Sequence, residues 1–458
     1  MTWMRRGLLA LVMVGWVAGC GRDTPPGNNP PPQEEPGDSP PQVISGSLKI
    51  HTRFWENNEG ATSAYVMLGD GTRFFTRLDA SGDVTFEDPS LVGPQDVTVV
   101  AHYESGFKNV STYLALERPE VWLLAARKSS TSPSRAYISG KVKGMGDPSQ
   151  VGVKAVGPGI WGTFGTPVKA DGSFRILVEG TLPAVVNLVA TERDPDDGPF
   201  GSKAIGLKRG IALSADQEVS GQELVLDHPV NQQTRLTLQG AEAYQHDSAS
   251  ASLQFFLDGR LLFETTEDGS YPSRLPSSIP SFTLTAPFDT VRARLLVDVG
   301  WFSEFSHGGV YAAFPVEDLS SVTLPLPKPT TLLSPTTLGP GLEPTPTRAD
   351  PDLVFTWSTD AAAQIVELFV APVDERSSLQ FNWTVRAPGT VTSFKPFTLR
   401  LDETSSVFPY YSGAYRIRLD SRFDADMGHY ADYFTQTPVS EPLTPAWQTV
   451  LDGSLDFR

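Results

Sequence analysis

Cysteine is almost absent from this 458-residue chain, which contains a single one, Cys20. No disulfide can form within the chain, so its folded parts must hold together by packing alone. Histidine is also scarce, and no two histidines have the spacing of a zinc-binding helix. We expect all six to be ordinary strand or loop residues: His51, His102, His228, His246, His307 and His429.

Positive charge is in deficit, with 36 Lys and Arg against 53 Asp and Glu and a formal net charge of −17. No basic run longer than two or three residues occurs, so the electrostatic signature of a nucleic-acid binder is missing. The acidic balance favours solubility and repels anionic surfaces. We therefore predict that nucleic acid is not a partner.

Catalytic motifs are missing as well. The nucleophile elbow G-x-S-x-G does not occur, and without it we expect the run His307-Gly308-Gly309 to be a turn rather than an oxyanion-hole loop. Acidic residues are numerous, but no pair has a distinctive setting for acid–base chemistry. We predict that the protein is not an enzyme. A hydrolase with a site assembled from distant strands is the alternative.

The N-terminus has the three parts of a secretory signal. Arg5 and Arg6 precede the apolar stretch 7–17, and small residues follow up to Cys20. The apolar stretch is too short to span a bilayer, which needs about 20 apolar residues. We therefore expect residues 1–19 to be a leader that is removed on export.

The run Val17-Ala18-Gly19-Cys20 resembles the lipobox of bacterial lipoproteins. The resemblance implies that acyl chains, palmitate among them, are attached at Cys20 and anchor the protein to the membrane. Gly21 follows instead of the aspartate that in many such proteins marks inner-membrane retention. This favours the outer membrane or the cell surface within the cell envelope. A lone buried cysteine that packs as a small hydrophobe is the alternative.

Residues 20–42 are expected to be a disordered linker behind the lipid. Segment 23–42 contains eight prolines and almost no residues that could build a core. A Pro-rich spacer of this length can reach roughly 60 Å at about 3.1 Å per residue. A polyproline ligand is the alternative interpretation.

From Val43 onward the pattern is typical of β-strands, because apolar and polar residues alternate between Gly, Asp, Asn and Pro joints. The clearest example is 291–299, where Val291, Leu295 and Val299 fall on one face. We predict an all-β fold class of tandem β-sandwich domains, Ig-like or transthyretin-like. The predicted domains are 43–127, 136–228, 234–327 and 330–458.

A weak internal repeat supports this division. Segments 44–49 and 138–143 open with Ile-Ser-Gly, and segments 76–86, 166–176 and 265–271 have the Asp-Gly or Ser-Gly turns of tight hairpins. An opening strand followed by such a hairpin resembles the carboxypeptidase regulatory-like, transthyretin-like sandwiches. The resemblance is best for 136–228, and it implies a non-catalytic domain that spaces or binds.

The last segment has a different pattern. A strand ending in Trp357 comes early, and Tyr415 opens a late strand in which Arg416, Arg418 and Asp420 alternate with apolar residues. This arrangement resembles a fibronectin type III sandwich, whose tyrosine hydroxyl bonds back to the backbone. Segment 330–458 exceeds the usual size of about 100 residues, so we expect insertions or an unusual last strand.

Two acidic loops are candidates for calcium, which prefers hard oxygen ligands at short spacing. The first consists of Asp424, Asp426 and Asp432, and the second spans 194–198. Solvated turns are the alternative for both. Heat released on titration with millimolar Ca²⁺ would distinguish the two interpretations.

Aromatic residues raise the possibility of carbohydrate binding, because exposed rings can stack on sugars. The sites considered are Trp55, Trp122, Trp161, Trp301, Trp383, Trp447 and the pair Tyr410-Tyr411. Sandwich cores also use many large aromatic residues. We therefore predict a non-enzymatic scaffold or adhesive lipoprotein with envelope proteins as partners. A surface lipoprotein that captures polysaccharide is the alternative.

Substitution Cys20→Ala tests the anchor. We expect the variant to incorporate no labelled palmitate and to remain as the uncut precursor, because the thiol is the acceptor of the lipid. Metabolic labelling followed by electrophoresis measures both effects. Labelled palmitate on the variant would contradict the lipobox interpretation.

Overall fold

The protein is all-β, as the sequence predicts. The computed structural model describes residues 43–52, 61–123, 133–165, 168–194, 201–245, 247–268, 275–304, 306–342, 352–373, 381–407, 413–435 and 443–457. The helices in these ranges are the short 3-10 turns η1 (Pro148–Gln150), η3 (Ala241–Tyr244) and η4 (Tyr430–Phe434). None of the helices in these ranges is long and apolar enough to cross a membrane.

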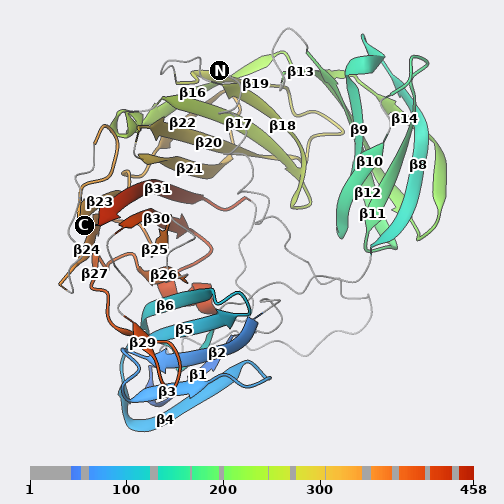
Figure 1. The fold of residues 1–458 in the computed structure, drawn as a ribbon. Coiled ribbons are helices and arrows are strands. Elements are labelled where there is room, and N and C mark those ends of the chain that lie inside the picture. The colour runs from blue at the N-terminus through green and yellow to red at the C-terminus, as the bar shows by residue number, and fades with distance from the viewer. Residues whose placement is uncertain are drawn as a thin grey trace.

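The strands form four groups along the chain, which we call units 1 to 4 (Figure 1). Unit 1 contains β1 (Ser45–His51), β2 (Ala61–Leu68), β3 (Phe74–Arg77), β4 (Asp83–Val92), β5 (Gln95–Tyr103), β6 (Lys108–Leu116) and β7 (Glu120–Trp122). Unit 2 contains β8 (Ser134–Lys143), β9 (Val151–Val156), β10 (Ile160–Gly165), β11 (Ser173–Gly180), β12 (Ala184–Arg193), β13 (Ser202–Leu213), β14 (Glu218–Val225) and β15 (His228–Pro229).

Unit 3 contains β16 (Gln232–Gln239), β17 (Ser248–Leu257), β18 (Arg260–Asp268), β19 (Ser278–Ser281), β20 (Arg292–Phe302), β21 (Ser306–Val316) and β22 (Ser321–Pro325). Unit 4 contains β23 (Thr331–Ser334), β24 (Phe355–Ser358), β25 (Ile365–Pro372), β26 (Phe381–Pro388), β27 (Ser393–Phe394), β28 (Leu399–Arg400), β29 (Ser406–Val407), β30 (Gly413–Asp424) and β31 (Ala446–Phe457). Whether each unit folds as an independent domain stays a prediction.

Units 1, 2 and 3 repeat one arrangement. The first strand of each pairs antiparallel with a later strand and parallel with one near the end: β1 with β4 and β7, β8 with β11 and β14, and β16 with β19 and β22. The internal repeat in the sequence thus corresponds to a repeated strand pairing. Unit 4 differs, with sheet order β23-β24-β27 facing β31-β30-β25-β26.

The turns of the repeat include one correction. Segment 166–176 leads into a true hairpin, since β10 pairs with β11. Segment 76–86 is not a hairpin, because β3 pairs with β2 whereas β4 pairs with β1 in the other sheet. The Ser-Gly sequence bends the chain as expected, but the sheet that each flanking strand joins depends on distant partners.

A single twelve-stranded sheet joins three of the units. Its order is β18-β17-β20-β21-β31-β30-β25-β26-β6-β5-β2-β3, so it runs from unit 3 through unit 4 to unit 1. Two ladders make the joints: β21 pairs antiparallel with β31, and β26 pairs parallel with β6. Backbone hydrogen bonds therefore connect unit 3 to unit 4 and unit 4 to unit 1.

The cores lie on opposite faces of this sheet. Leu295 of β20 and Leu419 of β30 belong to one buried cluster, which also covers the small sheets of units 3 and 4. On β6, Val110 belongs to that same cluster, whereas Tyr113 belongs to the separate core of unit 1. The side opposite Leu295 and Leu419, which we call the polar face, is therefore the side on which unit 1 packs.

The alternation predicted for 291–299 is confirmed. Val291, Ala293, Leu295, Val297 and Val299 are all buried, because successive side chains of a strand point to opposite faces. Asp298 and its neighbours thereby fall on the polar face.

Unit 2 docks against unit 3. Val189 and Ile205 on its outer surface belong to the larger buried cluster. Arg209 donates a hydrogen bond to the carbonyl of Pro287, and His228 Nε2 lies 3.3 Å from the hydroxyl of Thr285. Apolar packing and polar contacts together fix unit 2 at the side of the sheet (Figure 1).

Trp383 tests the joint between units 4 and 1. Its ring is fully buried, and its Nε1 donates to Thr112 Oγ1 of unit 1 at 2.9 Å. We expect Trp383→Ala to lower the free energy of unfolding by about 3–5 kcal/mol, as large aromatic truncations do. Urea denaturation followed by circular dichroism measures the change.

The control is Trp161→Ala, because Trp161 is 48% exposed. Exposed substitutions usually change stability by less than about 0.5 kcal/mol. Equal shifts of the urea midpoint in the two variants would contradict a structural role of Trp383 at the joint.

Candidate functional site

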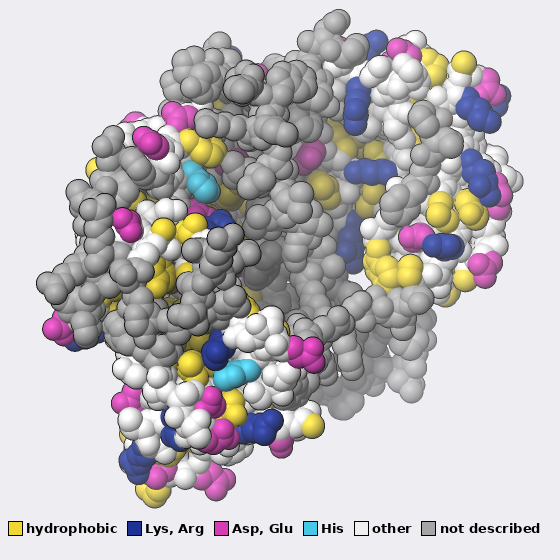
Figure 2. All heavy atoms as spheres, viewed as in Figure 1, with side chains coloured by type: hydrophobic (Ala, Val, Ile, Leu, Met, Phe, Trp, Pro, Cys, Tyr) yellow, Lys and Arg dark blue, Asp and Glu magenta, His cyan; other side chains and the backbone are white. Residues whose placement is uncertain are grey.

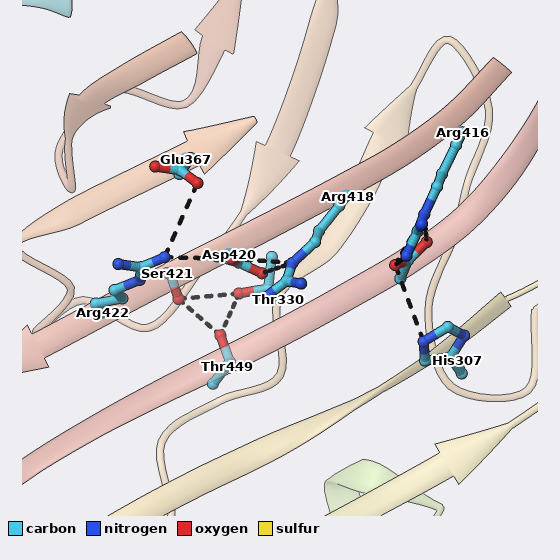
Figure 3. Close-up of polar contacts among 10 residues, drawn as sticks. His307, Thr330, Glu367, Arg416, Arg418, Asp420, Ser421, Arg422 and Thr449 are labelled. Carbon is cyan, nitrogen blue, oxygen red and sulfur yellow. Dashed lines mark hydrogen bonds and ion pairs between the residues drawn. The ribbon is translucent and has the colours of Figure 1, made fainter. Parts of the chain in front are cut away.

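Charged residues gather on the polar face where β21, β31, β30 and β25 lie side by side. The register places Glu367 opposite Asp420, and Arg418 opposite Asp452, which is itself opposite His307. Directly opposed residues of antiparallel strands project from the same face at close range. The strand pairing therefore builds one continuous polar cluster (Figure 3).

Asp420 is the centre of this cluster. It is only 2% exposed, and its carboxylate accepts from Arg418 Nε at 3.0 Å and from Arg422 Nη2 at 3.4 Å. Burial raises the pKa of Asp420 above its ordinary value even though both guanidinium groups favour the charged form. The two arginines thus hold a carboxylate in a place where water cannot solvate it.

Glu367 connects the cluster to unit 1. It pairs with Arg386 at 2.7 Å, and Arg386 lies over the ring of Tyr113 at 5.3 Å from the centroid. Burial alone would raise the pKa of Glu367, but Arg386 and Arg422 outweigh it and the pKa is lowered. The ion pair lies within unit 4, and the cation–π contact crosses the same joint as the β26–β6 ladder.

Asp452 connects the cluster to unit 3. Its carboxylate accepts from Arg416 Nη2 at 2.5 Å, and His307 Nε2 of β21 lies 4.0 Å away. Figure 3 shows Arg416 and His307 directed toward this carboxylate from two strands. Burial lowers the pKa of His307 more than Asp452 raises it, which favours the neutral imidazole.

Three hydroxyl groups form hydrogen bonds with one another on the other face of the same strands. Ser421 of β30 and Thr449 of β31 lie 2.7 Å apart, and both bond to Thr330 in the connection between units 3 and 4. All three residues are buried. The connection is thereby fixed to the strands that it precedes.

The cluster gathers three carboxylates and a histidine, which is the kind of setting in which a hydrolase site would be sought. However, Glu367, Asp420 and Asp452 each already bind a guanidinium group. Arg386 and Arg422 lower the pKa of Glu367 and favour its charged form, so this carboxylate is poorly suited to take a proton. The geometry therefore supports a structural ion network within unit 4, which Tyr113 of unit 1 and His307 of unit 3 contact at its two ends.

Asp298 stands at the unit 3 end of the polar face, opposite Tyr311. Burial raises its pKa to about 6, against a hydrogen bond from Tyr311 that lowers it. The same environment raises the pKa of Tyr311 to about 12. Both side chains therefore stay protonated and neutral to a higher pH than they would on an exposed surface.

The predicted calcium residues have other partners. Asp424 accepts from the backbone N–H of Asp426, and Asp426 accepts from Thr444 Oγ1 at 2.8 Å. Asp432 accepts from the N–H of His429 and pairs with Arg118 of unit 1. Within the described ranges, no three His, Cys, Asp or Glu residues form a group that could hold a metal ion. Calcium binding stays a prediction.

The second acidic loop is described only at Asp194, since Asp196 and Asp197 lie outside the described residues. Other predicted positions are also outside them, including the lipidation site. These are Cys20, Trp55, His246, Tyr410 and Tyr411.

The run His307-Gly308-Gly309 is a second correction, because it lies inside strand β21 and not in a turn. A Cβ on Gly308 would stand 2.4 Å from the carbonyl of Val450 and 2.9 Å from the ring of Trp301. Glycine is needed here because neighbouring strands and the indole approach the backbone closely.

Most of the described tryptophans serve the core. Trp301, Trp357, Trp383 and Trp447 are buried, which favours packing over sugar stacking at these positions. Trp122 stacks on His51 at 4.4 Å, and Trp161 is largely exposed.

Surface charge is mixed. Figure 2 shows basic and acidic side chains interspersed over the described part of one face of the molecule. Interspersed charges of both signs give little long-range attraction for a polyanion.

No protein-family model matches this chain, and no curated protein matches it. Among solved structures, the chain is similar to CBMbc, a family CBM26 domain of Eubacterium rectale Amy13K crystallised in complex with maltoheptaose. The two share 14% sequence identity, the match covers 39% of this chain and 93% of that chain, and the TM-score is 0.12. A TM-score this low carries no argument about the ligand of the present protein.

Asp298→Asn tests the polar face through its pH dependence. Between about pH 4 and 6, Asp298 is protonated in the folded state but ionised in the unfolded state. Above about pH 6 it is ionised in both states, so the folded state bears the full cost of burying the charge. We expect the variant to be more stable than the parent at pH 7.5, by up to about 3 kcal/mol at about 1.4 kcal/mol per pKa unit. Near pH 4 the difference should vanish.

Urea midpoints at the two pH values measure this effect. Asp216→Asn, at an exposed turn position, serves as the control and should show no comparable difference. A destabilised Asp298→Asn at pH 7.5 would show that the charged carboxylate is needed on this face.

Proposed function

We propose that the protein is a lipid-anchored, non-enzymatic scaffold or adhesive protein of the cell envelope. The observation that carries this proposal is the twelve-stranded sheet, which joins units 3, 4 and 1 through backbone ladders. Such a joint makes a stiff platform, because relative movement of the units would break several hydrogen bonds at once. Behind it, a lipid on Cys20 and the Pro-rich segment 23–42 would place the platform away from an outer-membrane or cell-surface anchor.

The finer family assignments belong to this proposal. The repeated strand pairing supports a carboxypeptidase regulatory-like, transthyretin-like assignment for unit 2. In unit 4, Trp357 is buried on β24 and Tyr415 is buried on β30. These positions support a fibronectin type III-like sandwich. The extra length includes the hairpin β28–β29, from which Arg400 lies 4.0 Å over the ring of Phe75 in unit 1.

The paired state of the carboxylates supports a binding role over catalysis. Each acidic residue of the polar cluster is paired with an arginine of unit 4. Envelope proteins are the first partner class. Polysaccharide capture is the second candidate function, and a half-exposed aromatic residue favours it: Phe302 is 50% exposed and stacks on His307, which lies 4.0 Å from the carboxylate that holds Arg416.

An affinity capture experiment tests the proposal. The full chain, solubilised in a polyoxyethylene detergent, is bound to beads and exposed to whole envelope extract. We expect retention of a defined envelope protein that resists glycosidase treatment and is absent from beads carrying a heat-unfolded sample. Material that free oligosaccharide displaces would support polysaccharide capture instead. Retention of neither would contradict both functions.

A further inference from the structure

The hairpin between β20 and β21 ends in an unusual surface feature. Phe302 is the last residue of β20, and His307 lies directly opposite it near the start of β21. Phe302 is 50% exposed, whereas Trp301 beside it is buried. Full burial of a Phe side chain would contribute about 1.5–3 kcal/mol to stability. Because Phe302 is half exposed, the fold gains only part of this free energy.

The two rings stack on each other. Their centroids are 5.8 Å apart and their planes differ by only 22°. Burial lowers the pKa of His307, so the imidazole at neutral pH is an uncharged flat ring. The outer face of this stack is suited to the C–H groups of a sugar ring.

Hydrogen bonds fix the conformation of the hairpin that carries the two rings. The N–H of Phe302 donates to Asp247 Oδ2 at 2.7 Å. Ser303 bonds to the carbonyl of Ser306 through its N–H at 2.7 Å and through its hydroxyl at 3.0 Å. A site fixed before binding loses less conformational entropy when its ligand arrives.

Arg416 supplies polar groups beside the rings. It is 56% exposed, and Asp452 fixes its Nε and Nη2. Among the described residues no acceptor binds its Nη1 group, which leaves two N–H donors for a ligand. Because Asp452 compensates the charge of Arg416, the patch offers hydrogen bonds without a strong attraction for anions.

The spacing sets the size of the ligand. Phe302, His307, Asp452 and Arg416 lie on β20, β21, β31 and β30, which are consecutive strands of the sheet. Three strand spacings of about 4.8 Å give a patch about 14 Å across. This is wider than one sugar ring and fits a short stretch of a chain.

We propose that Phe302, His307 and Arg416 form a binding site for a neutral polysaccharide, with a sugar ring on the outer face of the Phe302–His307 stack and hydroxyl groups accepting from Arg416. This inference rests on the second candidate function, polysaccharide capture. It is independent of the anchor and of any protein partner, so its failure would leave the scaffold role untouched.

Native affinity electrophoresis tests the site with the full chain in polyoxyethylene detergent, which has no sugar headgroup. The gels contain hydroxyethyl cellulose or soluble starch as the probe. We expect retardation in at least one of the two gels, weakened at least tenfold by Phe302→Ala and retained by Phe302→Tyr. Trp161→Ala, which removes an exposed aromatic ring from unit 2, should migrate as the parent does.

Arg416→Gln gives a second readout. It should weaken retardation while thermal unfolding confirms that the variant is folded. Absence of retardation in both gels, or equal retardation of the parent and Phe302→Ala, would overturn the site. The envelope-extract experiment would still decide the scaffold role, because a glycosidase-resistant protein partner does not depend on Phe302.

Discussion

Two β-ladders determine the architecture of this protein. The pairing of β21 with β31 and of β26 with β6 turns three sandwiches into one continuous sheet. Backbone groups in a buried ladder must be satisfied, and an orphaned N–H or C=O costs about as much as a lost hydrogen bond. Separation of the units would break both ladders at once, in addition to the side-chain contacts around them. Every other joint feature is placed by these ladders.

The ion network on the polar face depends on this placement. Removing one partner of a buried pair costs about 3–5 kcal/mol, whereas an apolar replacement of the whole pair can be neutral. Stability alone therefore does not explain why Glu367, Arg386 and Asp420 are charged. A charged set is matched only when the strands have the correct register, since a one-residue slip would send each side chain to the other face. We interpret the network as a device that specifies the register of the unit 4 strands, of which β31 and β26 form the two joints.

The sequence predicted the parts of this structure that depend on local pattern. The alternation in 291–299 correctly predicted the buried face of β20, and the alternation around Asp420 correctly separated Arg416 and Arg418 from the apolar residues. The shared sheet could not be predicted, because β26 and β6 are far apart in the chain and no local motif records their pairing. The same is true of the burial of Asp420, which depends on neighbouring strands. The failed hairpin at 76–86 has the same cause.

Both end strands of the shared sheet contact other parts of the same chain. A long open edge would invite pairing with other chains. At one end, unit 2 contacts β18 through β9, where Lys154 faces Glu264 and burial lowers the pKa of that lysine. At the other end, β3 is short and the β28–β29 hairpin packs over it through Arg400 and Phe75. Both end strands thus contact parts of the same chain, and the faces and hairpin tips are the surfaces that we propose for binding. The β20–β21 tip is one of these, and it is there that Phe302 is exposed.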